Sequence, residues 1–320
     1  MHKSRTLTPI VLTVAAALTA LSGASALAQT FPNKPITMWI GFKPGGSVDT
    51  TGRLVAEKLE KILGQPVVAV TKAGGGGTVM ATQLLSAKPD GYTIGMGASA
   101  AYALTPQLNK EIKYKIDDFQ HLATLTQPED AIVVKADSPW KSLKDMLDDA
   151  KKSGKTLSMT TQVAATRLMV MAISEKSGVQ FKLVPVNGGA EGLQSVLGGH
   201  VDVTWSGAGW SELVRAGKLK PLASMGDKRN QDFPDVPTLD ELGYNFAFTD
   251  TFMLSAPKGL PADVLKTLSS AIEKAIKDPE VQAKLHKNMH LDVAYRDSKE
   301  TAAFLHKQYD TVSPLIAKLK

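Results

Sequence analysis

Short apolar runs alternate with longer amphipathic runs along most of the chain. The runs "ITMWIGF" (36–42) and "PVVAV" (66–70) predict strands, and apolar residues recur at helical spacing between them. The alternation returns at 92–97 and then throughout 130–207. Because strands that alternate with helices form mainly parallel sheets covered on both faces, the pattern predicts an α/β fold.

The C-terminal part has a different pattern. "FPDVPTLDELGY" (233–244) is typical of a loop followed by a short helical piece, and "TFMLSAPKGLP" (251–261) introduces mainly helical sequence. In parallel α/β sheets, ligands sit at the carboxyl ends of strands. We therefore expect a site among the turns that follow the predicted strands.

The first 28 residues have the three-part pattern of a secretory signal. A short basic start precedes an apolar core, and small residues follow at Ala26 and Ala28. We expect residues 1–28 to be a signal peptide cleaved near Ala28, which makes the mature protein periplasmic. A membrane anchor is the alternative, but the apolar run is short and ends in a cleavable site.

Composition narrows the function further. The chain of 320 residues contains no cysteine, which excludes disulfides and cysteine-ligated metals. Its length after the signal suits two domains of ordinary size. The formal net charge is +6, but the lysines are spread along helical segments, so no nucleic-acid partner is expected. A mildly basic protein of this kind suits an acidic small molecule.

The turn "GFKPGGSVDTTGR" (41–53) leads from a predicted strand into a predicted helix. Gly45 and Gly46 leave room for a ligand near the main chain, and Ser47 is a good helix N-cap residue. The amides that follow point outward at the positive end of the helix dipole, which attracts a carboxylate or a phosphate. An ordinary tight turn with a capped helix is the alternative.

Other small-residue turns also lie between a predicted strand and a predicted helix. "AGGGGTVMA" (73–81) lacks the glycine spacing of a dinucleotide site and the Gly-Lys-Ser/Thr of a nucleotide phosphate loop. "TTQVAATR" (160–167) ends in Arg167, near the start of a predicted helix. Its guanidinium could hold a second carboxylate through a bidentate pair, and a solvated surface arginine is the alternative. "GASAAYALTP" (97–106) and "NGGAEG" (187–192) are similar turns.

Catalytic and metal patterns are weak in this sequence. His286 and His290 are four residues apart but lack the Glu of H-E-x-x-H, so no metal site is expected. Ser99 could be combined with His200 and Asp202 as a triad, but nothing in the sequence supports that geometry. We therefore expect no enzymatic activity and no cofactor. An exported serine hydrolase that uses Ser99 is the competing hypothesis.

Five motifs, in order, resemble the solute-binding receptors of the tripartite tricarboxylate transporter system, known as the Bug family. Together they span nearly all of the chain after the signal. They are the segments 31–69, 73–100, 184–203, 233–244 and 254–268.

The resemblance implies a type II periplasmic-binding-protein fold, in which two α/β domains form a "Venus flytrap" with two hinge crossings. We expect residues 29–134 and 251–320 to form domain 1, and residues 135–250 to form domain 2. Such receptors capture a small carboxylate in the interdomain cleft and deliver it to membrane permease subunits. The expected partners are thus a carboxylate ligand and a permease, and the protein is expected to be a monomer. A sensor subunit for a signalling partner would use the same closed shape.

The resemblance also implies which residues bind the ligand. The first glycine turn and its neighbour would hold one carboxylate on main-chain amides and water, and Asp49 would order the turn or act through water. The residues implied in domain 1 are Lys43, Gly45, Gly46, Ser47, Val48, Asp49, Ala98, Ser99 and Ala100. Those implied in domain 2 are Thr160, Thr161, Gln162, Ala165, Thr166, Arg167, Gly188, Gly189 and Asp202.

Three positions depart from the family's usual pattern. Lys43 stands where a proline or an aromatic-flavoured residue is common, Arg167 where a histidine is frequent, and Phe252 where a tryptophan is usual. A second cationic contact beside an apolar wall favours a dicarboxylate. An aromatic dicarboxylate such as terephthalate fits the same features.

Overall fold

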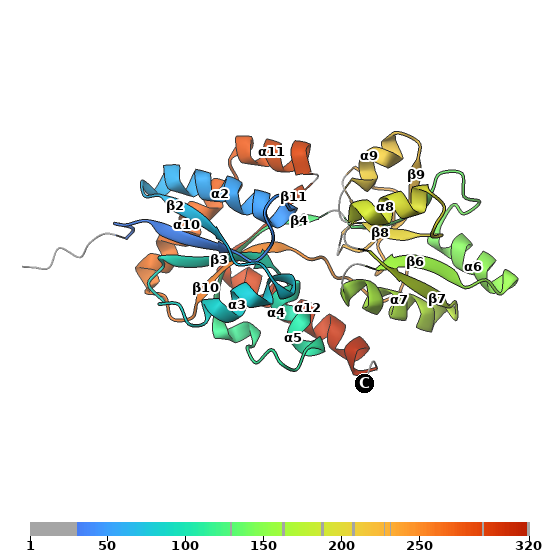
Figure 1. Cartoon of the computed structure of the whole chain (residues 1–320), viewed down its shortest axis with the longest axis horizontal. Coiled ribbons are helices and arrows are strands. Elements are labelled where there is room, and N and C mark those ends of the chain that lie inside the picture. The colour runs from blue at the N-terminus through green and yellow to red at the C-terminus, as the bar shows by residue number, and fades with distance from the viewer. Residues whose placement is uncertain are drawn as a thin grey trace, which may run out of the picture.

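The computed structural model forms two lobes of sheet and helix that lie side by side (Figure 1). The described residues are 31–128, 130–161, 164–186, 189–206, 209–226, 228–230, 232–289 and 291–318. The predicted signal peptide and the candidate ligand residues Gln162 and Gly188 lie outside them. No helix in these ranges is long and apolar enough to cross a bilayer.

The first lobe is built on a six-stranded sheet with the order β11-β4-β10-β3-β1-β2. Strands β1, β2 and β3 are parallel, whereas β10 and β11 run antiparallel to their neighbours. Only the part of this sheet formed by β1, β2 and β3 is parallel, as expected for the whole sheet. β10 is antiparallel because it enters the sheet as the chain returns from the second lobe. The strands are β1 (Ile36–Ile40), β2 (Val67–Thr71), β3 (Thr93–Ala98), β4 (Phe119–Pro128), β10 (Phe252–Pro257) and β11 (Leu291–Arg296).

The second lobe contains two smaller groups of strands. β5 (Ala131–Lys135) pairs with β8 (Thr204–Ser206) and β9 (Leu219–Ser224). β6 (Leu157–Thr161) pairs in parallel with β7 (Phe181–Pro185), and a parallel bridge from Met159 to Val203 links the two groups.

The strand pairing also places β5 relative to the predicted boundary between residues 134 and 135. All of β5 pairs within the second lobe, because the chain has left the first sheet before it meets β8 and β9. Residues 131–134 thus belong to a sheet of the second lobe, whereas the predicted division placed them in domain 1.

Each lobe has its own apolar core. One buried cluster includes Met38, Ile94 and Leu254, and another includes Leu157 and Met169. The helices of the first lobe are α2 (Ser47–Leu63), α3 (Thr78–Leu84), α4 (Ala100–Ala103), α5 (Thr105–Leu108), α10 (Ala262–Ile276), α11 (Pro279–Met289) and α12 (Ser298–Ala317). Those of the second lobe are α6 (Leu143–Ser153), α7 (Ala164–Ser177), α8 (Gly189–Leu197) and α9 (Trp210–Arg215).

Helix α12 connects the two lobes in addition to the two chain crossings (Figure 1). It begins beside β11 and contacts β4, and its Gln308 Nε2 donates to the Thr249 carbonyl at 2.7 Å. Near its end, Val312 and Ile316 join the buried cluster of the second lobe. Lys318 then pairs with Glu175 of α7 at 2.6 Å. The relative position of the lobes is therefore supported by a third segment.

Helix α2 approaches the first sheet most closely at Gly52. A Cβ at this position would lie 2.9 Å from Met96 Cγ and 3.1 Å from Ile40 Cδ1. Gly52→Val is therefore expected to lower the free energy of unfolding by about 1–3 kcal/mol, because overpacking displaces core side chains. Thr50→Ala, on the exposed side of the same helix, should stay within about 0.5 kcal/mol in urea unfolding. Equal effects of the two changes would contradict this packing.

Candidate functional site

The glycine turn after β1 leaves donors free at the start of α2. Gly45 has a left-handed backbone (φ 83°), and Gly46 rather than Ser47 is the N-cap residue, with no side-chain cap. The amides of Gly46, Ser47 and Val48 have no acceptor among the described residues. These amides lie at the positive end of a helix of 17 residues, so they can hold an anion.

Asp49 fixes the shape of this turn. Its carboxylate is 3% exposed and accepts from the Gly45 amide at 3.0 Å and from Arg53 Nε at 3.0 Å. Burial alone would raise the pKa of Asp49, but the hydrogen bonds from Arg53 and Gly45 outweigh it and hold the pKa below its usual value. Asp49 thus stays ionised and orders the turn, which is one of the two roles expected for it.

The turn after β3 is already occupied by the chain itself. Ser99 is fully buried, its amide donates to the Thr251 carbonyl at 2.9 Å, and its hydroxyl donates to the Thr249 carbonyl. The Ala100 amide donates to Asp250 Oδ1 at 2.8 Å. The expectation that these amides hold a ligand is therefore not met in this arrangement, because residues 249–251 satisfy them. The buried Ser99 is likewise unsuited to act as a nucleophile.

Asp250 is a site residue that the sequence did not point to. It lies on the crossing that returns to the first lobe, and its carboxylate fills the position expected for a ligand at the start of α4. Burial raises its pKa to about 6, although the hydrogen bonds from Ala100 and Ser99 partly offset that rise. No local motif distinguishes Asp250 from a surface acid, since its role depends on a residue about 150 positions away in the chain.

The second lobe presents the starts of α7 and α8 on the side that faces the first lobe (Figure 1). Arg167, in the first turn of α7, is exposed and makes no hydrogen bond or ion pair with any described residue. Thr166 is fully buried, and its hydroxyl has no hydrogen-bond partner among the described residues. Gly189 begins α8. Lys43, in the first lobe, is also exposed and unpaired within the described ranges.

Five other predicted residues contact only the protein itself. The Thr160 hydroxyl bonds to that of Thr204 inside the second lobe, and Ala165 is 5% exposed. The carbonyl of the half-buried Thr161 accepts from the Val186 amide at 3.0 Å, and Ala98 is fully buried at the end of β3. Phe252 is 7% exposed and packs in the first-lobe core instead of lining an open surface.

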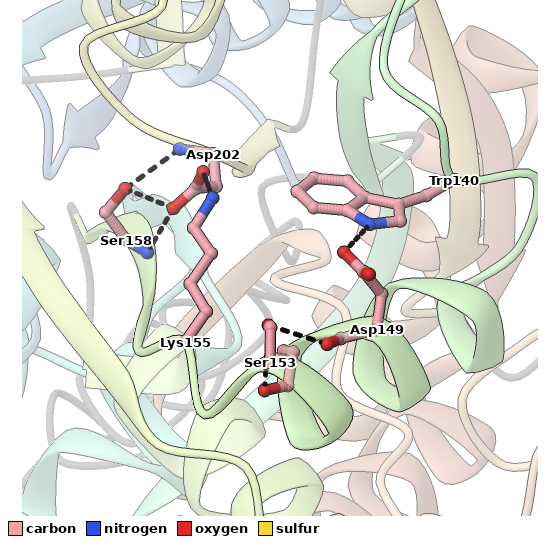
Figure 2. A network of polar contacts seen from close by, with 7 residues as sticks. Trp140, Asp149, Ser153, Lys155, Ser158 and Asp202 are labelled. Carbon is pink, nitrogen blue, oxygen red and sulfur yellow. Dashed lines mark hydrogen bonds and ion pairs between the residues drawn. The ribbon is translucent and has the colours of Figure 1, made fainter.

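The structure separates Asp202 from the other predicted site residues of the second lobe. Asp202 precedes β8 and bonds to the start of β6, whereas Thr160 and Thr161 lie at the opposite, carboxyl end of β6. Its carboxylate accepts from the Ser158 amide at 2.8 Å and from Lys155 at 2.5 Å (Figure 2). Burial would raise the pKa of Asp202, but these bonds lower it overall. The residue therefore ties two strand starts together.

Comparisons with known proteins agree with this architecture. Residues 51–320 match the family model of the tripartite tricarboxylate transporter family receptor. A protein encoded in the gbd 5′ region of Cupriavidus necator is 36% identical, covering 92% of this chain and 90% of that protein. BugT from Bordetella pertussis is 31% identical, covering 88% and 87% respectively.

Solved structures show the same arrangement. A TctC solute-binding protein from Polaromonas, without ligand, has a TM-score of 0.79 and 28% identity, over 90% of this chain and 100% of that one. MatC from Rhodopseudomonas palustris, with bound malate, has a TM-score of 0.72 and 25% identity, over 89% and 100%. The fold is thus that of a two-domain periplasmic binding protein.

The chain belongs to the tripartite tricarboxylate transporter receptor family, as the five motifs indicated. Receptors of this family are periplasmic solute-binding proteins. They bind small molecules and work with membrane transporter components.

Proposed function

We propose that this protein captures a small dicarboxylate between its two lobes and delivers it to membrane permease subunits. The observation that carries the proposal is the row of free amides at Gly46, Ser47 and Val48, held in place by Asp49. Preorganised amides replace the hydration of a carboxylate without adding a second buried charge. The malate bound to MatC supports a carboxylate as the ligand.

Arg167 supplies the second contact in this proposal. Its guanidinium lies at the start of α7 and pairs with no residue that the structure describes, so it suits a carboxylate at the far end of the ligand. Lys43 adds positive charge beside the glycine turn. A ligand that reaches both lobes favours their closure, because only the closed state satisfies both of its ends.

One predicted contact, at the start of α4, is left out of this proposal. Since Asp250 already accepts from the Ala100 amide, the ligand carboxylate is assigned to the α2 turn alone. Export with cleavage near Ala28, and action as a monomer, complete the proposal. A sensor subunit would use the same binding site, whereas a hydrolase would need an accessible Ser99.

A thermal-shift screen of mono-, di- and tricarboxylates, aliphatic and aromatic, tests the proposed function. A ligand that binds the native form raises its melting temperature, and the rise increases with the logarithm of the ratio of ligand concentration to Kd. Dicarboxylates are expected to give the largest rise, and their methyl esters none. The absence of any shift with every carboxylate would overturn the proposal.

Gly46→Ala tests the position of the ligand. Gly46 has φ −81°, and an added Cβ would meet nothing nearer than the Lys43 carbonyl at 3.6 Å. The change should cost at most about 1 kcal/mol of stability, yet its methyl group lies where the ligand meets the amides. We expect at least a tenfold loss of carboxylate affinity by calorimetry.

A matched control is Ser142→Ala, which removes the side-chain cap of α6 in the second lobe. It should cost a similar amount of stability, about 1 kcal/mol, with no effect on ligand affinity. If both variants bind the carboxylate as the unchanged protein does, the ligand does not sit on the α2 turn.

A further inference from the structure

A cavity of about 400 Å³ lies between the lobes, away from the proposed carboxylate site. The first lobe contributes residues of β11, and the second lobe contributes the segment after β9. Asp130 and Thr249, next to the two chain crossings, complete its wall. None of the residues of the proposed carboxylate site lines it, so this is a separate space.

Buried polar groups without partners are concentrated in this cavity. Among the described residues, eleven buried side-chain N and O atoms have no hydrogen-bond partner. Four of them line this one cavity: both carboxyl oxygens of Asp130, Nδ2 of Asn230 and Oγ1 of Thr249. Asp130 is 5% exposed and Thr249 6%. Because native proteins satisfy nearly all buried polar groups, such a concentration points to a polar occupant.

The charges of the wall indicate what the occupant carries. The Asp130 carboxylate can only accept hydrogen bonds when ionised, so it calls for a donor such as an ammonium group. On the second-lobe side, Asn230 Nδ2 is a free donor, and the exposed Lys228 forms no hydrogen bond or ion pair with a described residue. Arg229 also lines the cavity, although Glu241 holds its guanidinium at 2.9 Å.

A simple ion does not complement the charged groups that line this cavity. A cation would meet Asp130 and Asp292 but also lie among Lys228, Arg229 and Arg296, and an anion would meet the two acids. A molecule with an ammonium group at one end and a carboxylate at the other satisfies both sides. The pKa of Asp130 is raised well above its usual value by burial and by the charge of Asp250, so a cationic partner would stabilise its ionised form.

We propose that this cavity is a second ligand site, which takes a small zwitterion of the α-amino acid type. Its ammonium group donates to the carboxylate of Asp130 and the hydroxyl of Thr249. Its carboxylate accepts from Asn230 Nδ2 and pairs with Lys228. The proposal does not depend on the carboxylate site at α2, because the two sites share no residue.

Calorimetric titration of the full mature chain with glycine, acetate and methylammonium tests this second site. Glycine is expected to bind saturably, and acetate and methylammonium at least tenfold more weakly. Asp130→Asn keeps the shape of the side chain and removes its charge, and Lys228→Gln changes an exposed residue, so both variants should fold. Each should weaken glycine binding at least tenfold.

Lys182→Gln is the matched control, because Lys182 is an exposed lysine on β7 that pairs with none of the described residues. It should leave glycine affinity unchanged. Three results would overturn the proposal: no glycine binding, which leaves a cavity filled by water; glycine binding unaffected by Asp130→Asn, which places glycine at the α2 turn; or acetate or methylammonium binding as tightly as glycine.

Discussion

Replacing Arg167 with alanine is expected to weaken dicarboxylate binding by about 2 kcal/mol or more, roughly thirty-fold in Kd. The guanidinium lies at the start of α7 without a partner in the described part of the chain, and its loss leaves the far carboxylate of a bound ligand without its partner. A monocarboxylate of the same length has no group there and should lose less than twofold. Calorimetric titration of the purified variant with both ligands measures the difference.

The exposed position of Arg167 allows its effect on binding to be separated from any effect on stability. Because the side chain is exposed and unpaired within the described chain, its truncation should change stability by no more than about 0.5 kcal/mol. Lys182→Ala, which removes a similar positive charge from β7, should affect neither ligand. Equal losses for the two ligands in Arg167→Ala would mean that this arginine does not meet a second carboxylate.

Asp130→Asn is expected to stabilise the ligand-free protein by about 1–3 kcal/mol at neutral pH, since the amide is neutral, whereas the buried carboxyl group must either take up a proton or hold a charge without a partner among the described residues. The folded state raises the pKa of Asp130, so it holds the proton more tightly than the unfolded chain does. The contribution of Asp130 to stability is then greatest below the unfolded pKa and falls as pH rises. The advantage of the variant should therefore grow as pH rises from about 4.

Scanning calorimetry of both proteins from about pH 4 to pH 8 tests this sign. Asp235→Asn is the control, because Asp235 is an exposed acid with no described contact and loses the same charge. It should show no pH-dependent difference from the unchanged protein. If the difference in stability between Asp130→Asn and the unchanged protein stays constant, or becomes smaller as pH rises, Asp130 is not held as a buried acid without a partner.

The glycine turn illustrates what could be predicted from local sequence. Two glycines between an apolar run and a helical pattern indicate a helix start with free amides, because that chemistry depends on residues within one turn of each other. The structure places those amides at Gly46 to Val48, and Asp49 orders them. Only the exact cap residue differed, since Gly46 takes the position assigned to Ser47.

Contacts between residues far apart in the sequence determine the environment of the other predicted site residues. The Ser99 and Ala100 amides have the same local signals as the first turn, but the segment 249–251 comes back to satisfy them. Asp202 precedes β8 in the sequence. Its bonds to Ser158 and Lys155 place it at the start of β6, at the opposite end from Thr160 and Thr161. Sequence spacing carries no information about such pairings.

The family resemblance of five sequence motifs implied the two-lobe class. The order of strands and helices and the free amides at the start of α2 could be predicted from the sequence alone. They follow from periodicity and from the chemistry of neighbouring residues. Only the tertiary structure decided that Asp250 accepts from the start of α4 and that Asp130 and Thr249 line the cavity between the lobes. The physical reason is that the two crossings bring together residues that lie far apart along the chain.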